Sequence, residues 1–306
     1  MKTYLAILLL CVASFSSHGA KKTIEWAITS FPPGYILNGS EKGKGYGDLL
    51  DAFMIKALTQ YNHKIVEYPN WERQTKVLEG GPLVCNSLFF YQAPENRGKI
   101  NGHYSISAPN AVFFLHDVVV RKSQRHKYGA KVSFRTLLNN KQFIFGYNRP
   151  YGTIYNQILG EYLGVPSNLD FGSIDSRDRL AYLNGADNIY IRVGGNLIGG
   201  MINMLRAGRV DYILEYDFMM KFQSKFLEFD DELVSIPVEE VYNKTSRGAY
   251  ACSDTPDGRK AIAAINDILK HARPTEAYKR ALNYLVSENK DVRYWKEYQK
   301  ILNIYQ

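Results

Sequence analysis

Two hydrophobic patterns alternate along the chain, one with the period of a strand and one with the period of a helix. Residues 23–29 alternate apolar and polar side chains and end at a Pro-Pro-Gly turn, which predicts a strand followed by a loop. Apolar residues three and four positions apart follow Gly45 and predict a helix. The same alternation predicts strands at 64–68 and 83–90, with a helix at 71–78 between them.

The alternation continues through the second half of the chain. An apolar run with three consecutive valines predicts one long buried strand at 111–121. Strands that alternate with helices are typical of an α/β fold built from parallel βαβ units, whose ligand sites lie at the carboxyl ends of the strands. The remaining expected elements are strands at 142–146, 188–193 and 210–215, helices at 152–163 and 198–207, and a helical tail from Gly258.

The first twenty residues have the pattern of a secretory signal peptide. Lys2 supplies the positive start, residues 4–12 form an apolar run, and small residues follow up to Ala20. The apolar run is too short to span a bilayer core, so a membrane anchor is the weaker alternative. We therefore expect residues 1–20 to be cleaved and the mature protein to be periplasmic.

Composition refines this picture. A chain of 306 residues with 45% hydrophobic and 22% charged side chains is globular, and its length exceeds what one compact core needs, so two lobes are expected. The formal charge is +8, and loss of Lys2 with the signal leaves 37 basic against 30 acidic residues, or +7. In a secreted protein this excess favours a small anionic ligand over nucleic acid.

Only two cysteines remain once Cys11 is removed with the signal. Cys85 and Cys252 would then share an oxidising compartment, where either a disulfide or two separate buried thiols are the alternatives. The cysteines and histidines show no C-x-x-C or H-x-x-x-H spacing, so no metal and no cofactor is predicted. No G-x-S-x-G turn or other local nucleophile motif is present.

Several short motifs stand in a characteristic order along the chain. Phe31-Pro32-Pro33 follows the first predicted strand, and Gly45-Tyr46-Gly47-Asp48-Leu49-Leu50 opens the first helix. The segment from Ala93 to Arg97, followed by residues 104–109, is similar to a T-x-x-R…F-S-x-P pattern, and Gly208-Arg209-Val210-Asp211 is similar to a G-R-x-D-A turn. The ordered set resembles the type II periplasmic solute-binding proteins, in particular the amino-acid-binding family 3.

The resemblance implies a specific architecture. It predicts two α/β lobes, joined by two crossovers, that close on a ligand like a hinge. Lobe one would comprise residues 21–112 plus 247–306, and lobe two residues 113–246. The same resemblance sets the strands that hold Cys85 and Cys252 side by side, which favours the disulfide.

Arg97 is the first ligand-binding residue that the resemblance implies. In amino-acid-binding relatives the arginine of the T-x-x-R segment grips the ligand carboxylate. A guanidinium suits this task because its planar donor fork matches a carboxylate bidentately. The alternative is a solvated surface arginine.

Lobe two is expected to contribute Gly152 and Thr153 at the start of a helix. Relatives use a Gly-Thr-Thr turn there, and in this chain Ile154 replaces the second threonine. Free N–H groups at a helix N-terminus bind anions, although a plain helix cap explains the same residues equally well. Arg149 nearby either adds positive charge or is solvated.

Glu215 is the expected acidic residue of the site. Relatives place an aspartate near this point to hold the ligand ammonium, but the corresponding position falls on Tyr216, between Glu215 and Asp217. This departure weakens the case for α-amino-acid recognition. Glu215 would hold a cationic or hydroxylated group, or would instead be paired with a neighbouring arginine.

Aromatic side chains complete the expected site. Tyr is frequent, at 23 residues, and aromatic residues fall repeatedly at predicted strand ends. Flat rings with polar tips stack on ligands at little entropic cost, and we predict that Phe31, Trp71 and Tyr147 do so. Arg73 lies two positions after Trp71 and is also predicted to line the pocket.

These features together predict a monomeric binding protein that is not an enzyme. It would capture a small polar ligand, anionic or zwitterionic, and present it to an ABC-type transporter or a membrane sensor. Ligand contacts to both lobes would stabilise the closed form over the open one. The alternative is a periplasmic enzyme on the same scaffold, such as a cyclic-acid dehydratase, with Glu215 as general acid.

Overall fold

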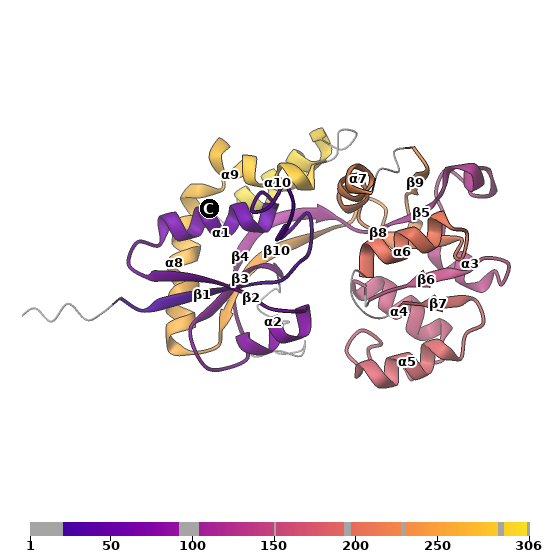
Figure 1. The fold of residues 1–306 in the computed structure, drawn as a ribbon, viewed down its shortest axis with the longest axis horizontal. Helices are drawn as coiled ribbons and strands as arrows, with labels where there is room; N and C mark the ends of the chain where they lie inside the picture. The colour runs from indigo at the N-terminus through magenta and orange to yellow at the C-terminus, as the bar shows by residue number, and fades with distance from the viewer. Residues whose placement is uncertain are drawn as a thin grey trace, which may run out of the picture.

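The computed structural model describes residues 21–91, 104–149, 151–192, 197–227, 231–286 and 291–304. The predicted signal peptide and Arg97 lie outside these ranges. The described chain forms two five-stranded sheets with helices around them (Figure 1). Figure 1 shows one lobe in the colours of both chain ends and the other in the colours of the middle of the chain, as expected for an α/β fold with one lobe inserted in the other.

Lobe one, as used below, is the first sheet with its helices. The sheet has the order β2-β1-β3-β10-β4. Its strands are β1 (Thr23–Ile28), β2 (Asn62–Glu67), β3 (Val84–Phe90), β4 (Tyr104–Phe114) and β10 (Thr245–Ser253). Its helices are α1 (Tyr46–Ala57), α2 (Trp71–Leu78), α8 (Pro256–Ala272), α9 (Glu276–Ala281) and α10 (Asp291–Ile304).

Lobe two is the second sheet with its helices. The sheet has the order β7-β6-β8-β5-β9. Its strands are β5 (Asp117–Arg121), β6 (Phe145–Tyr147), β7 (Ile189–Ile191), β8 (Tyr212–Glu215) and β9 (Leu233–Ile236). Its helices are α3 (Phe134–Asn139), α4 (Thr153–Tyr162), α5 (Ser176–Asn184), α6 (Leu197–Arg206) and α7 (Asp217–Phe226).

The long strand predicted at 111–121 is wrong, because the chain changes sheets inside this run. β4 ends at Phe114 and pairs with β10, whereas β5 starts at Asp117 and pairs with β8 and β9. The expectation of all-parallel units holds only in part. β1 is parallel to β2 and β3, and β6 is parallel to β7 and β8, but β10 and β5 run antiparallel to their neighbours.

Two crossings join the lobes, from β4 to β5 and from β9 back to β10. Their registers fix which edges of the sheets face each other. β10 comes from lobe two and pairs Gly248 with Phe90, so the carboxyl end of β3 points towards lobe two. β5 comes from lobe one and pairs Asp117 with Glu215, so the carboxyl end of β8 points towards lobe one. The predicted lobe boundaries, after residues 112 and 246, fall inside β4 and β10.

The Pro-Pro-Gly turn and the Gly-x-Gly helix start belong to one structural unit. The N–H groups of Tyr46 and Gly47 donate to the carbonyls of Pro33 and Gly34, at 2.9 and 2.8 Å. A Cβ atom on Gly45 would lie 2.2 Å from the Gly34 carbonyl oxygen, so only glycine allows this close approach. These contacts hold the start of α1 against the turn that follows β1.

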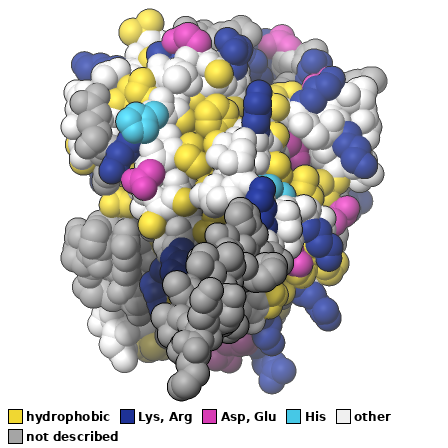
Figure 2. Space-filling view, turned by 90° about the vertical axis from the view of Figure 1, so that its left-hand side faces the viewer, with side chains coloured by type: hydrophobic (Ala, Val, Ile, Leu, Met, Phe, Trp, Pro, Cys, Tyr) yellow, Lys and Arg dark blue, Asp and Glu magenta, His cyan; other side chains and the backbone are white. Residues whose placement is uncertain are grey.

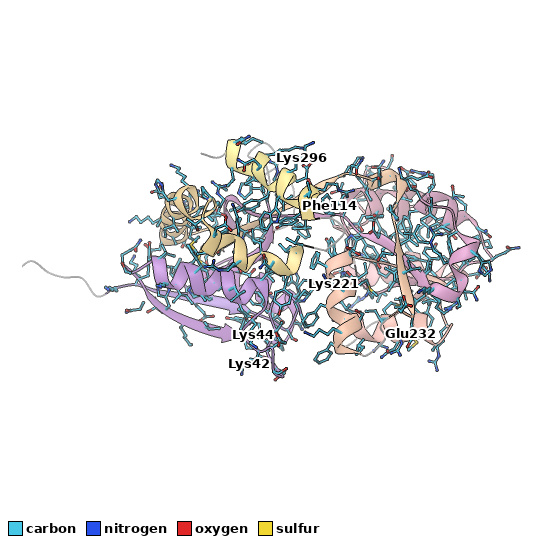
Figure 3. The ribbon with its side chains drawn as sticks, turned by 90° about the horizontal axis from the view of Figure 1, so that it is seen from above. Lys42, Lys44, Phe114, Lys221, Glu232 and Lys296 are labelled. Atoms are coloured by element: carbon cyan, nitrogen blue, oxygen red, sulfur yellow. A yellow bond between two sulfur atoms is a disulfide. The ribbon has the colours of Figure 1, made fainter. Side chains whose placement is uncertain are left out.

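Helix α7 packs across the junction between the lobes. Its Phe218 and Met219 are buried in the same cluster as the core of lobe one. The ring of Phe218 meets the ring of Tyr46 edge-on at 6.1 Å between centroids. The lobes therefore share apolar contacts beside the crossings. Figure 3 labels Lys221 of α7 and Phe114 of β4 in this region.

The predicted disulfide is present. Cys85 of β3 and Cys252 of β10 lie directly opposite each other in the antiparallel ladder, with 4.1 Å between their Cα atoms, and their sulfurs are bonded. Both residues are fully buried. The bond ties the strand that re-enters from lobe two to the centre of the first sheet.

The outer surface of lobe one is mixed in character. Figure 2 shows Lys and Arg side chains scattered over this face among hydrophobic and neutral ones, without a single basic patch. In the described part of the chain, no helix combines the length and the apolar character needed to cross a bilayer.

Candidate functional site

The carboxyl ends of β1, β2 and β3 in lobe one and of β6, β7 and β8 in lobe two form the candidate site. We call these two sets of strand ends the facing edges. The register of β6 places Phe145 beside Tyr212 of β8 and Tyr147 beside Ile191 of β7, so the three strands end together. Loops at such strand ends are the usual position of ligand sites in α/β sheets.

An ion pair stands at the centre of the lobe-two edge. Arg149, in the loop after β6, donates from Nη2 to Oε1 of Glu215 at 2.6 Å. The same oxygen accepts the backbone N–H of Tyr216 at 2.9 Å. Glu215 is 1% exposed and the Arg149 side chain 18% exposed. Of the two alternatives open for Glu215, the structure contains the pair with a neighbouring arginine.

The ion pair with Glu215 stabilises the charged form of Arg149. Burial disfavours its charge, but the attraction of Glu215 outweighs that effect and raises the pKa of Arg149. Nη2 of Arg149 makes the hydrogen bond to Glu215, whereas Nη1 is buried and has no hydrogen-bond partner. Arg149 is therefore a largely buried cation with one donor group still unpaired.

His116 lies beside this pair and was not anticipated from the sequence. Its ring stacks on Tyr216 at 3.7 Å between centroids and meets the edges of Tyr151 and Tyr155. Burial, with a smaller effect of Arg149, lowers the pKa of His116 well below its usual value of 6.5. Neither ring nitrogen has a hydrogen-bond partner. A neutral imidazole thus stands in the wall of the site.

Tyr147 ends β6 and is 4% exposed. Burial raises its pKa to about 12, against a weaker opposing effect of Arg179. The guanidinium of Arg179 lies near the Tyr147 hydroxyl without meeting hydrogen-bond geometry, because it is held by the carbonyls of Phe171, Gly172 and Ile174. The phenol of Tyr147 is therefore neutral and available as a donor.

Helix α4 starts at the same edge. Gly152 is its N-cap and supplies no side-chain cap, and Thr153 is exposed at the first helical position. Asn156 takes part in the turn by accepting the Tyr151 N–H through its side chain at 3.0 Å. A Cβ atom on Gly152 would meet nothing within 4 Å. The start of α4 thus has open space in front of it.

The lobe-one edge brings two of the predicted aromatic residues together. Phe31 in the turn after β1 and Trp71 at the start of α2 are 6.1 Å apart between ring centroids, and Trp71 stacks on Phe89 at 5.8 Å. Trp71 remains 39% exposed. Arg73 is exposed, and its backbone N–H donates to the Asn70 cap of α2.

The structure thus gathers the predicted residues into two groups. Phe31, Trp71 and Arg73 lie at the lobe-one edge, and Tyr147, Gly152, Thr153 and Glu215 at the lobe-two edge. His116 and Arg192 were missed, and Arg149 was not chosen. Arg149 lies three residues after the predicted strand 142–146, and Arg192 lies next to the last residue of the predicted strand 188–193. A basic residue close to the end of a predicted lobe-two strand is the signal that would have found both.

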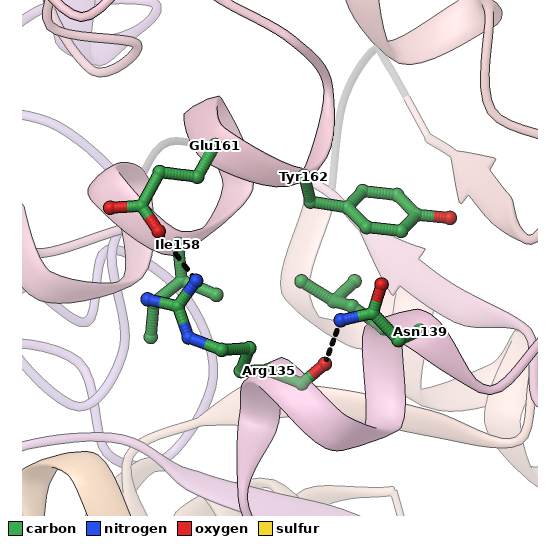
Figure 4. A pocket seen from close by; sticks show the side chains of 6 residues that line it. Arg135, Asn139, Ile158, Glu161 and Tyr162 are labelled. Atoms are coloured by element: carbon green, nitrogen blue, oxygen red, sulfur yellow. Dashed lines mark hydrogen bonds and ion pairs between the residues drawn. The ribbon is translucent and has the colours of Figure 1, made fainter.

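Two pockets are lined by residues other than the site residues named above. One, of about 170 Å³, lies between α3 and α4, where Arg135 donates to Glu161 at 2.5 Å across its floor (Figure 4). The other, of about 330 Å³, lies beside α1 and is lined in part by Asp48, Asp51 and Ile65. Among the described residues no group of His, Cys, Asp and Glu is arranged to hold a metal ion.

Solved structures match the chain over most of its length. A histidine kinase sensor domain with similarity to periplasmic binding proteins has a TM-score of 0.58 at 13% identity, covering 87% of this chain and 96% of its own. The substrate binding protein of an amino acid ABC transporter has a TM-score of 0.54 at 15% identity, covering 85% and 97%. An ancestral amino-acid-binding protein, a precursor of cyclohexadienyl dehydratase, has a TM-score of 0.56 at 14% identity, covering 87% and 96%.

No family model matches the sequence, and neither does any curated protein. The likeness to solved structures therefore rests on the fold. It shows that the chain has the two-lobed type II architecture of periplasmic binding proteins, as the sequence motifs predict.

Proposed function

We propose that this protein is an extracytoplasmic solute-binding protein, which captures a small polar ligand, anionic or zwitterionic, between its lobes. The observation that carries this proposal is the opposition of the facing edges, each furnished with side chains suited to a ligand. The exposed ring of Trp71 lies at one edge and the largely buried guanidinium of Arg149 at the other. A ligand that contacts both edges would favour the closed arrangement over the open one.

Structural neighbours support a proposal for the membrane protein that receives the ligand. Proteins of this fold include the substrate binding protein of an ABC transporter and a sensor domain of a histidine kinase. We propose that the mature protein is released by cleavage of residues 1–20 and acts as a monomer, and that its closed form is recognised by a membrane transporter or sensor. Arg97 remains a proposed ligand contact from lobe one.

The test is a thermal-shift screen of the mature chain against amino acids, carboxylic acids, oligopeptides, sugars and nucleotides. A binding protein is expected to be stabilised by a ligand that is recovered unchanged, because binding to the native state alone raises the melting temperature. Small-angle scattering with and without the ligand should show a smaller radius of gyration on binding. Stabilisation without compaction would contradict the hinge mechanism.

An enzyme on the same scaffold is the second candidate, since one structural neighbour is a precursor of a dehydratase. A dehydratase would need a general acid with a proton to donate. Oε1 of Glu215 instead accepts two hydrogen bonds, from Arg149 and Tyr216, which favours binding over catalysis. Product analysis of each stabilising compound decides between the two, and turnover that is lost in Glu215→Gln would establish the enzyme.

A further inference from the structure

Three buried hydrogen-bond donors of residues near the lobe-two edge have no partner. Nη1 of Arg149, the hydroxyl of Tyr147 and Nε of Arg192 are all buried and make no hydrogen bond in the described part of the protein. The side chains of Tyr147 and Arg192 leave opposite faces of the sheet, since the Tyr147 ring packs on Phe171 and the Arg192 guanidinium lies against Gly200 of α6. Arg149 Nη1 is therefore the unpaired donor that lies beside the ion pair with Glu215. Unpaired buried donors are costly, and native proteins satisfy nearly all of them.

We propose that Arg149 binds a carboxylate of the ligand through its unpaired Nη1, with Glu215 as the residue that positions Arg149. The proposal rests on the solute-binding function given above and names the ligand class of that site. It also assigns the anionic end of the ligand to lobe two.

The geometry of Arg149 supports this assignment. A guanidinium presents several N–H groups in a planar fork, and one side of that fork is enough to grip a carboxylate. Arg149 uses Nη2 on Glu215 and keeps Nη1 unpaired, so it can hold two carboxylates at once. The start of α4 follows three residues later and adds free N–H groups that also favour an anion.

Glu215 is poorly placed to bind a ligand ammonium itself. Its side chain is 1% exposed, and the oxygen that Arg149 contacts is also bonded to the Tyr216 N–H. An ammonium would have to compete with a guanidinium for this carboxylate. The neutral ring of His116 stacks against Tyr216 and adds no charge, and one of its two unpartnered nitrogens carries a further donor hydrogen.

The lobe-one edge indicates the rest of the ligand. Trp71 is 39% exposed and Phe90 50% exposed, so apolar ring faces are available where β2 and β3 end. Rings of this kind stack on flat apolar groups. The site therefore fits a carboxylic acid with a flat apolar body and no required α-ammonium group.

Three compounds with one phenylalkyl body test the ligand class, namely 3-phenylpropanoate, phenylalanine and 2-phenylethylamine. Calorimetric titration of the mature chain is expected to show 3-phenylpropanoate binding at least tenfold tighter than 2-phenylethylamine and no weaker than phenylalanine. Tighter binding of phenylalanine or of the amine overturns the inference. A panel hit without an acidic group overturns the inference while the binding function stands, and the absence of any ligand overturns both.

Arg149→Lys tests the binding residue, because lysine keeps the charge and a contact to Glu215 but lacks the donor fork. We expect at least a tenfold loss of 3-phenylpropanoate affinity with an unchanged far-ultraviolet dichroism spectrum. Arg135→Lys is the matched control, since Arg135 also pairs with a glutamate but lies on α3 away from the facing edges. Equal affinities in Arg149→Lys and the control overturn the assignment.

Glu215→Gln tests the positioning residue by the sign of its effect. Glutamine keeps an acceptor for Arg149 and removes the compensating negative charge, so 3-phenylpropanoate is expected to bind as tightly as before or tighter. A residue that held a ligand ammonium would instead weaken phenylalanine selectively. A tenfold loss of phenylalanine affinity in folded Glu215→Gln, with 3-phenylpropanoate affinity unchanged, contradicts the positioning assignment.

Discussion

Arg149 donates to Glu215 across 2.6 Å, and this contact joins the loop after β6 to the end of β8, 66 residues further along the chain. Because both side chains are largely buried, each charge depends on the other for compensation. The pair therefore fixes the shape of the lobe-two edge as well as its charge.

Breaking this pair from one side should be costly. We predict that Glu215→Leu lowers the free energy of unfolding by about 3–5 kcal/mol, because it leaves the guanidinium of Arg149 buried without a counter-charge. Urea unfolding curves measure the loss. The double variant Arg149→Met/Glu215→Leu removes both charges and should recover most of the stability, and a double variant as unstable as the single one would contradict this account.

The disulfide should stabilise the folded state by constraining the unfolded chain. Cys85 and Cys252 are 167 residues apart, so the bond closes a long loop. We expect the double variant Cys85→Ala/Cys252→Ala to lose about 2–4 kcal/mol. Thermal melts with and without reductant provide the control, since the melting temperature of the natural chain should fall on reduction and that of the variant should not change.

Gly45 should tolerate no side chain. A Cβ atom there would meet the Gly34 carbonyl oxygen at 2.2 Å, so Gly45→Ala is expected to separate the start of α1 from the turn after β1 and to lower the melting temperature clearly. Gly80→Ala is the matched control, because a Cβ atom at Gly80 meets nothing within 4 Å. Equal melting temperatures in the two variants would show that the turn and the helix are not in contact.

His116 should make the protein less stable in acid. Burial and Arg149 lower the pKa of His116 well below 6.5, so below that pH the unfolded chain takes up a proton that the folded chain refuses. Stability is expected to fall by up to about 1.4 kcal/mol for each pH unit below 6.5 through this residue. His116→Phe should lack this contribution, and unfolding curves for the two proteins at pH 7 and pH 5 measure the difference.

Elements with one face buried in their own lobe were predictable from local pattern. Helix α2 spans Trp71–Leu78 as predicted, and β3 starts one residue after the predicted position. The Gly45 motif correctly predicted the start of α1, and the structure adds that only glycine fits at this position. In these segments the spacing of apolar side chains and the backbone chemistry of a turn are local properties.

The local sequence pattern did not predict features that depend on contacts between residues far apart in the chain. The run at 111–121 is mostly apolar, and neither Leu115 nor His116, between the two strands, is a glycine or proline that would mark the passage from one sheet to the other. The partner of Glu215 likewise depends on the pairing of β6 with β8. The sequence shows which charged residues lie at strand ends but not which strands are adjacent. Both alternatives for Glu215, a ligand contact and an arginine partner, were therefore compatible with the sequence.

Asp51 should oppose His116 in the pH dependence of stability, because a buried acid acts in the opposite sense. Burial is the main cause that raises the pKa of Asp51 to about 8, and the hydrogen bonds from Tyr35 and Ser87 only partly offset it. Between the ordinary value of 3.8 and about 8 the folded chain holds a proton that the unfolded chain has lost, so stability falls as pH rises through this window. The expected slope of the free energy of unfolding is about 1.4 kcal/mol per pH unit.

Asp51→Asn tests this contribution. It keeps an acceptor for the Tyr35 hydroxyl, which donates to Asp51 at 2.8 Å, and should remove the slope. Unfolding curves for the natural chain and Asp51→Asn at pH 5, 6 and 7 measure it, and parallel slopes in the two proteins would mean that Asp51 is charged in the folded state.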